Sequence, residues 1–218
     1  MTKPIRAVAF DMDGTMANSE DVYEHVGTET LRRRGHEFTD ELRHRMMGQP
    51  AAQALAVMIA HHGLSDTIEA LEVEGEELFW EIAHTILKPM PAVREFLSAV
   101  DGAGLPRCVV TSGSRRYADR ILGEIGLDGF QFKITADDVT NGKPHPEPYL
   151  LAAERFGVAP DEMLVLEDSG NGCKSGVAAG AVTVALPNHH TAGHDFSGAT
   201  LVADTLADPA IRGLLKLS

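Results

Sequence analysis

The sequence predicts an α/β protein in which a core built on a parallel β-sheet carries an inserted helical domain. Of residues 5–10, five of six are apolar without a helical period, and the run stops at two carboxylates and a glycine, as a short buried parallel strand does. Past residue 89, short apolar runs alternate with helical patterns, which is typical of βαβ units, whereas residues 21–88 show no strand pattern. Since one strand cannot satisfy its own backbone hydrogen bonds, the first strand belongs with the later ones. The predicted core comprises residues 1–18 and 89–218, and the inserted domain comprises residues 19–88.

The composition limits the class of protein. The 218 residues suffice for a substantial hydrophobic core, and 44% of them are hydrophobic. With 32 acidic against 19 basic residues the formal charge is −13, which argues against a binder of nucleic acids or anionic membranes. We see no signal-peptide pattern and no apolar run near the roughly 20 residues that span a bilayer, and we expect a cytoplasmic protein. Cys108 and Cys173 are isolated, which predicts structural thiols and no disulfide or zinc site.

Residues 19–88 are predicted to form a bundle of about four helices. The last of them is expected to begin at a capping box made by Asp66 and Glu69. Phe79 and Trp80 within that helix are expected in the core of the bundle, not against a substrate. The earlier helices are predicted near residues 22–31, 42–47 and 51–59.

The second part of the chain is predicted to alternate strands with helices. In a sheet of this kind the carboxyl ends of the strands share one edge, and ligands bind in the crevice beside that edge. Polar residues that directly follow a strand are therefore the candidates for a site. The predicted strands are residues 108–110, 132–134, 163–166 and 182–186, with an edge strand at 201–202, and the predicted helices are residues 93–100, 118–125, 148–156 and 173–179.

Two carboxylates follow the first strand. Asp11 and Asp13 are one residue apart, so both side chains reach one small site, where their charges repel unless a hard cation or a shared proton compensates them. Gly14 frees the backbone after the pair, and Thr15 is expected to hydrogen-bond across the turn. This segment therefore predicts a site with two neighbouring carboxyl groups at the edge of the sheet.

Two later segments supply groups that phosphate binding needs. In Thr111-Ser112-Gly113, a hydroxyl and a flexible turn at a strand end can donate to phosphate oxygens, and the next helix adds its N-terminal dipole. Lys143 stands between Gly142 and Pro144, which restrain its backbone and suit a fixed positive charge. At an effective dielectric near 20, an ammonium about 4 Å from a unit negative charge gains roughly 4 kcal/mol. Such a contribution matters in a protein whose net charge repels anions.

A second acidic pair, Glu167 and Asp168, follows the predicted strand 163–166. It repeats the arrangement of Asp11 and Asp13 at another strand end. Four carboxylates that converge on one crevice are hard to keep ionised without a metal. An all-oxygen set with open positions for water and phosphate suits Mg²⁺.

These segments together resemble the four motifs of the haloacid dehalogenase-like (HAD) superfamily. They are Asp-Met-Asp-Gly-Thr at residues 11–15, Thr111, Gly-Lys-Pro at 142–144 and Glu-Asp-Ser at 167–169, in the superfamily's order and across essentially the whole core. The resemblance implies a Rossmann-like three-layer core, and the helical insertion looks like a C1-type cap. The pattern is most similar to the subgroup of β-phosphoglucomutase and phosphoglycolate phosphatase. Asn18, where members often carry aspartate, departs mildly from the pattern and bears on the hinge.

The resemblance implies a mechanism. Asp11 attacks phosphorus and forms an aspartyl-phosphate, while Asp13 protonates the leaving oxygen and then activates water. Thr111 and Lys143 stabilise the transferring group together with Mg²⁺. The implied ligands of Mg²⁺ are Asp11, the backbone carbonyl of Asp13, Asp168 and, assisting, Glu167. The implied phosphate-binding residues are Asp11, Met12, Thr111, Ser112, Gly113 and Lys143.

The expected function is a Mg²⁺-dependent phosphatase for a small phosphorylated metabolite such as a sugar phosphate. The expected partner is this phosphate ester, with no nucleic acid or membrane, and the chain is expected to be a monomer, with a dimer as the alternative. A dehalogenase would lack the acids Asp13, Glu167 and Asp168. A non-catalytic binding module would be favoured by loss of Asp11, Lys143 or Asp168, all of which are present. A phosphomutase and a phosphoglycolate phosphatase stay open.

The cap segment favours a phosphatase over a mutase. A mutase must grip a phosphorylated sugar in two orientations, so its cap needs cationic side chains for the phosphate that is not transferred. In caps of the β-phosphoglucomutase type, a lysine precedes the cap's glycine and an arginine follows it. Aligned on Gly48, these positions are Met47 and Ala51 here, and the nearby Arg43 and Arg45 occupy other helical positions. Water is therefore expected to win the competition for the aspartyl-phosphate.

Overall fold

The computed structural model describes residues 3–46 and 51–216. The chain divides into two compact units, which we call the core (Met1–Asn18 with Lys88–Ser218) and the helical unit (Ser19–Leu87). Lys88, which the sequence pattern assigns to the insertion, belongs to the core. At this boundary the backbone N–H of Asn18 donates to the Lys88 carbonyl (3.2 Å), and the Lys88 N–H donates to Asn18 Oδ1 (2.7 Å). The Asn18 side chain therefore ties together the two segments at which the core meets the insertion.

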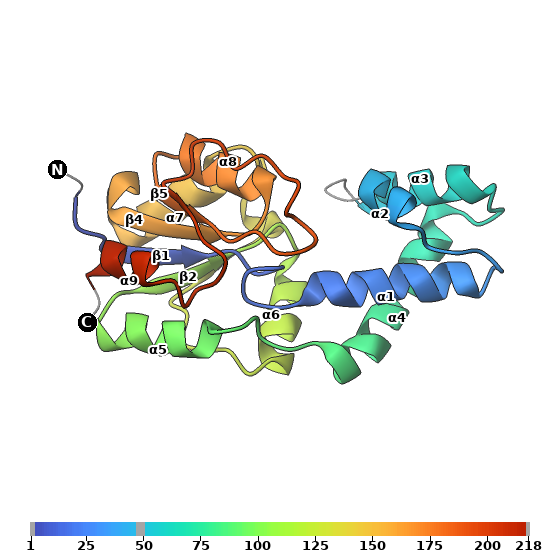
Figure 1. The fold of residues 1–218 in the computed structure, drawn as a ribbon, viewed down its shortest axis with the longest axis horizontal. Coiled ribbons are helices and arrows are strands. Elements are labelled where there is room, and N and C mark those ends of the chain that lie inside the picture. Colours follow the sequence, from blue (N-terminus) through green and yellow to red (C-terminus); the bar gives the residue numbers. More distant parts are fainter. Residues whose placement is uncertain (1–2, 47–50, 217–218) are drawn as a thin grey trace. The chain divides into compact units, whose positions relative to one another are not determined.

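The core contains a six-stranded parallel sheet in the order β3-β2-β1-β4-β5-β6. Figure 1 labels four of these strands, β1, β2, β4 and β5. This arrangement confirms the predicted α/β class with a Rossmann-like parallel sheet. The order reverses between β1 and β4, which pair in register from Ala7 with Met163 to Phe10 with Leu166, and such a switch point is where parallel α/β sheets bind ligands. The strands are β1 (Ala7–Phe10), β2 (Arg107–Val110), β3 (Lys133–Ile134), β4 (Met163–Glu167), β5 (Val182–Ala185) and β6 (Leu201–Val202).

The core's helices are α5 (Val93–Gly102), α6 (Arg115–Glu124), α7 (Glu147–Phe156), α8 (Gly170–Ala178) and α9 (Pro209–Leu215). Helices lie on both faces of the sheet, and the alternating side chains of β1 contact one helix on each face. Ala9 belongs to a buried cluster with Tyr149 of α7, whereas the Phe10 ring packs edge-on against Phe96 of α5, with ring centroids 5.9 Å apart. Two helices thus hold β1 from opposite sides, which fixes the strand that ends at Asp11.

Two helices begin earlier than their apolar period predicts. Ser114 caps α6 by accepting the N–H of Tyr117 (3.3 Å), and Ser169 caps α8 by accepting the N–H of Gly172 (3.0 Å). The first turn of each helix is polar or glycine-rich, so the pattern of apolar residues misses it. The apolar pattern also gives no prediction of α9, which begins at Pro209 after the cap residue Asp208.

The helical unit is built from α1 (Ser19–Arg32), α2 (Asp40–Met46), α3 (Ala51–His62) and α4 (Ile68–Ile86). Phe79 and Trp80 are buried, as predicted. The predicted cap at Asp66 is wrong: Thr67 caps α4 by accepting the N–H of Ala70 (3.2 Å), while Asp66 binds Arg34. The predicted helix 42–47 ends at Met46 in the structure, and Met47 and Gly48 lie outside the described residues.

Cys108 and Cys173 are buried free thiols, as the sequence predicts. Burial raises the pKa of both thiols, and the charge of Glu167 adds to the rise for Cys173. Both sulfurs therefore stay protonated at neutral pH. Among the described helices, none has the length and hydropathy needed to cross a membrane.

Candidate active site

Lys143 joins the carboxyl ends of three strands. Its Nζ lies 2.6 Å from Asp11 Oδ1, 2.6 Å from Glu167 Oε1 and 2.8 Å from the carbonyl of Val110. Its side chain is only 5% exposed. An ammonium group has three N–H donors, so these three acceptors use all of them and fix the charge in place. The structure thus brings together Asp11 and Lys143, which are far apart in the sequence.

The buried charges shift one another's pKa. Burial raises the pKa of Asp11 well above its ordinary value and the charge of Glu167 adds to this, whereas Lys143 acts in the opposite direction. Burial alone would lower the pKa of Lys143, but the charges of Asp11 and Glu167 outweigh burial and raise it. Lys143 is therefore protonated at neutral pH, and further positive charge near Asp11 would favour the ionised form of that carboxyl.

Glu167 is fully buried and engaged through both oxygens. Its Oε1 accepts a hydrogen bond from the Tyr149 hydroxyl (2.6 Å), and its Oε2 accepts one from Ser169 Oγ (3.2 Å). Burial and the charge of Glu167 raise the pKa of Tyr149, so its hydroxyl stays a donor. A Cβ at Gly172 would lie 1.9 Å from this carboxylate, so α8 passes this close only because that residue is glycine. Tyr149 is a site residue that the sequence does not mark, since it occupies an ordinary apolar position of a helix.

Three carboxylates form a cluster that can hold a cation. Asp11, Glu167 and Asp168 are buried, and each offers an oxygen within 4.8 Å of the others. Lys143 supplies a single positive charge against these three negative ones, and the charge of Glu167 adds to the rise that burial causes in the pKa of Asp11. A hard divalent cation with oxygen ligands would relieve it. The residues present therefore fit Mg²⁺.

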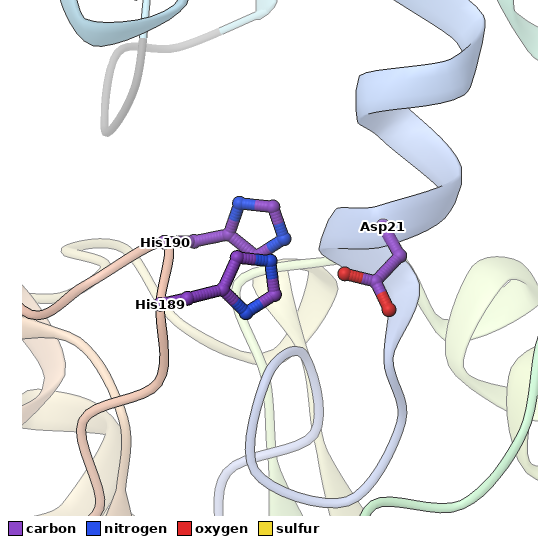
Figure 2. Close-up of side chains that lie close together, drawn as sticks. All are labelled: Asp21, His189 and His190. Carbon is purple, nitrogen blue, oxygen red and sulfur yellow. The ribbon is translucent and has the colours of Figure 1, made fainter.

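Asn188, on the loop after β5, orients Asp168. Its Nδ2 donates to Asp168 Oδ2 (2.8 Å) and to the carbonyl of Gly14 (3.3 Å), which links the acid after β4 to the turn that follows Asp13. Its Oδ1 in turn accepts the backbone N–H of His190 (2.8 Å). Figure 2 shows the His190 ring beside that of His189, and their centroids are 3.8 Å apart. Asp21, also drawn there, lies in the first turn of α1. Asn188 stands in no recognisable motif, so the sequence alone does not mark it as a site residue.

Asp13 accepts a hydrogen bond on each carboxylate oxygen. Thr111 Oγ1 donates to its Oδ2 (3.2 Å), and the Tyr117 hydroxyl of α6 donates to its Oδ1 (2.9 Å). Thr111 also accepts the backbone N–H of Gly113 (3.0 Å), which closes the turn after β2. Asp13 and Thr111 are thus together, and Tyr117 joins them although it lies in none of the four motifs.

The remaining predicted residues differ in how they face the site. Met12 is fully buried, so its side chain is unavailable to a ligand and its backbone is the part that can bind phosphate. Ser112 is exposed at the turn after β2. The expected hydrogen bond from Thr15 is wrong: within the described part of the chain its buried hydroxyl has no partner.

The fold and this cluster define a class of protein, an α/β enzyme with an acidic site at the switch point of a parallel sheet. The profile of the haloacid dehalogenase-like hydrolase family matches residues 5–180, and the chain belongs to this family. This confirms the predicted membership.

Two named relatives and one solved structure are similar to this chain over most of its length. The chain is 32% identical over 177 residues to a phosphorylated carbohydrates phosphatase of Thermotoga maritima, covering 81% of this chain and 82% of the relative. It is 33% identical over 189 residues to hexitol phosphatase A of Escherichia coli, covering 81% of each chain. A HAD family hydrolase of Deinococcus radiodurans, solved with bound phosphate and sodium, superposes with a TM-score of 0.82 at 28% identity, over 99% of this chain and 98% of that one.

Proposed function

We propose that this phosphoric monoester hydrolase is a Mg²⁺-dependent phosphatase that acts on a small phosphorylated metabolite, such as a sugar phosphate, through an aspartyl-phosphate intermediate. The observation that carries the proposal is the placement of Lys143 against Asp11, with Asp13 and Thr111 hydrogen-bonded beside them. The names of the relatives, a phosphorylated carbohydrates phosphatase and a hexitol phosphatase, support the substrate class.

In the first step, a carboxylate oxygen of Asp11 forms a bond to phosphorus while the bond from phosphorus to the leaving oxygen breaks. Asp13 gives its proton to that oxygen, and the product alcohol departs. Lys143 holds Asp11 in place and supplies positive charge next to the transferring group. Thr111 and the backbone of the turn that follows it are the proposed phosphate donors.

In the second step, Asp13 takes a proton from a water molecule as the water oxygen bonds to phosphorus. The bond between phosphorus and Asp11 breaks, inorganic phosphate leaves, and both aspartates return to their starting states. Asp13 thus releases one proton and regains one in each cycle. We propose that the helical unit (Ser19–Leu87) serves as a cap domain that excludes water during these steps.

Asp11, Asp168 and the backbone carbonyl of Asp13 are the residues we propose to hold Mg²⁺. Glu167 assists mainly by fixing Lys143, because both of its oxygens already accept hydrogen bonds. Bound at these residues, Mg²⁺ supplies charge neutralisation for the phosphoryl group and for Asp11.

Removal of the metal tests the ligand set. EDTA is expected to abolish phosphate release and Mg²⁺ to restore it, because every proposed ligand is oxygen. Ca²⁺ is expected to bind with poor turnover, since its coordination geometry is looser. Calorimetric titration of the metal-free protein with Mg²⁺ gives a readout independent of activity. A requirement for zinc would contradict the assignment.

A direct assay separates a phosphatase from a mutase. We expect the protein, incubated with β-glucose 1-phosphate, Mg²⁺ and a bisphosphate primer, to release inorganic phosphate faster than it accumulates glucose 6-phosphate. The cationic side chain of Arg43 is already paired with Glu24 (2.9 Å) and Asp40 (2.9 Å), so it is a poor clamp for a second phosphate. Faster accumulation of glucose 6-phosphate would show that the protein is a mutase. A parallel screen of sugar phosphates, phosphoglycolate and nucleotides identifies the preferred ester.

A further inference from the structure

Tyr117 is placed on the core by its own helix and by a glycine. Its backbone N–H donates to the cap residue Ser114, which sets it in the first turn of α6. Its ring lies over the turn after β2, where a Cβ at Gly113 would come within 2.6 Å of the Tyr117 Cδ1 atom. The ring is half-buried, and its hydroxyl lies 2.9 Å from Asp13 Oδ1. The absence of a side chain at residue 113 therefore lets this hydroxyl reach the proposed acid.

The two hydroxyls that donate to Asp13 differ in their other tasks. Thr111 lies in the turn that we propose binds phosphate, so its hydroxyl is shared between that task and Asp13. The Tyr117 hydroxyl approaches the other carboxylate oxygen from α6. A carboxylate that accepts one hydrogen bond can still rotate about its χ2 torsion, whereas donors on both oxygens fix its plane.

We infer that Tyr117 is a positioning residue for Asp13. Its hydroxyl holds the carboxylate beside Thr111, in the orientation from which Asp13 gives its proton to the leaving oxygen. The inference rests on the proposed phosphoryl transfer and adds to it a residue outside the four motifs. Tyr117 does not exchange a proton with substrate in this role. Its contribution is the orientation of the group that does.

A comparison of two substrates with different leaving groups shows whether Tyr117 positions Asp13 or only stabilises the fold. An alkyl phosphate leaves as a strongly basic oxygen that needs the proton of Asp13, whereas p-nitrophenolate leaves readily without one. The quantity kcat/KM reports the steps up to departure of the leaving group. We therefore compare kcat/KM for glucose 6-phosphate and p-nitrophenyl phosphate in the parent, Tyr117→Phe and Asp13→Asn proteins. The phenylalanine keeps the ring and removes only the hydroxyl.

The Tyr117→Phe protein is expected to lose about 10-fold or more in kcat/KM with glucose 6-phosphate and less than about 3-fold with p-nitrophenyl phosphate. Asp13→Asn is expected to show the same selectivity with a larger loss. The matched control is Asp119→Asn on the same helix, which alters the ion pair of this exposed aspartate with Lys133 and is expected to change neither value.

Three results would overturn the inference. An equal loss with both substrates, accompanied by a lower unfolding temperature, would make Tyr117 a structural residue. An unchanged or increased kcat/KM with glucose 6-phosphate would show that the hydroxyl does not support the working orientation. If the parent protein hydrolyses neither ester while it binds Mg²⁺, the proposed function fails and the inference fails with it, which is a different result from the loss of selectivity in one variant.

Discussion

Replacing Asp11 by asparagine is expected to abolish Mg²⁺-dependent phosphate release, with a fall of at least ~10⁴-fold in kcat, and to leave the fold intact. The amide has nearly the shape of the carboxylate but is a poor nucleophile, and it provides one fewer anionic ligand for the metal. Phosphate release under saturating substrate measures the loss, and circular dichroism checks the fold.

The matched control is Asp161→Asn. Asp161 is an exposed aspartate whose partner is Lys3, and its replacement is expected to leave turnover unchanged. Rapid-quench trapping adds a test of the intermediate, since radiolabelled phosphate should be retained on the parent protein and be absent from Asp11→Asn. Full activity in the Asp11 variant would reject the mechanism. An active parent without any acyl-phosphate would instead indicate direct attack by water.

Replacing Lys143 by methionine is expected to remove activity and also to lower the free energy of unfolding by about 3–5 kcal/mol at pH 7 in the absence of divalent metal. Both Asp11 and Glu167 lie 2.6 Å from the ammonium group, so its loss leaves two buried carboxylates without their shared cation. Chemical denaturation with EDTA present measures this change.

The loss of unfolding free energy in Lys143→Met should be larger at higher pH. Burial and Glu167 already hold the pKa of Asp11 above its ordinary value of 3.8, and removal of Lys143 takes away the charge that opposes them. Between the ordinary and the raised pKa the folded state then binds more protons than the unfolded state, so stability falls as pH rises through that window. The variant should therefore be less destabilised at pH 5 than at pH 7.

Lys174→Met is the control for this comparison, because Lys174 pairs with Asp195 at the surface (3.4 Å). Such an exposed pair contributes about 1 kcal/mol or less, so the control should unfold nearly as the parent does. If Lys143→Met were as stable as the control at both pH values, the buried ion-pair cluster would have no energetic role.

The sequence alone determined the sheet and its acidic edge, for a local reason. The apolar runs of β1 and β4 are uninterrupted because both faces of a central parallel strand are covered, and each run stops at the acids that begin the site. Asp11, Asp13, Thr111 and Lys143 were found because each stands beside a strand end or in a restrained turn. Their positions thus carry a signal that is visible without knowledge of the packing.

The groups that support those residues are set by the packing of the folded chain. Tyr149, Asn188 and Tyr117 reach the acids across the fold, from α7, from the loop after β5 and from α6, and nothing in their neighbours in sequence marks them. The same is true of the hydroxyl of Thr15, which the backbone buries away from any described partner. A hydrogen bond between side chains distant in sequence depends on how helices pack on a sheet, and apolar periodicity does not encode that geometry.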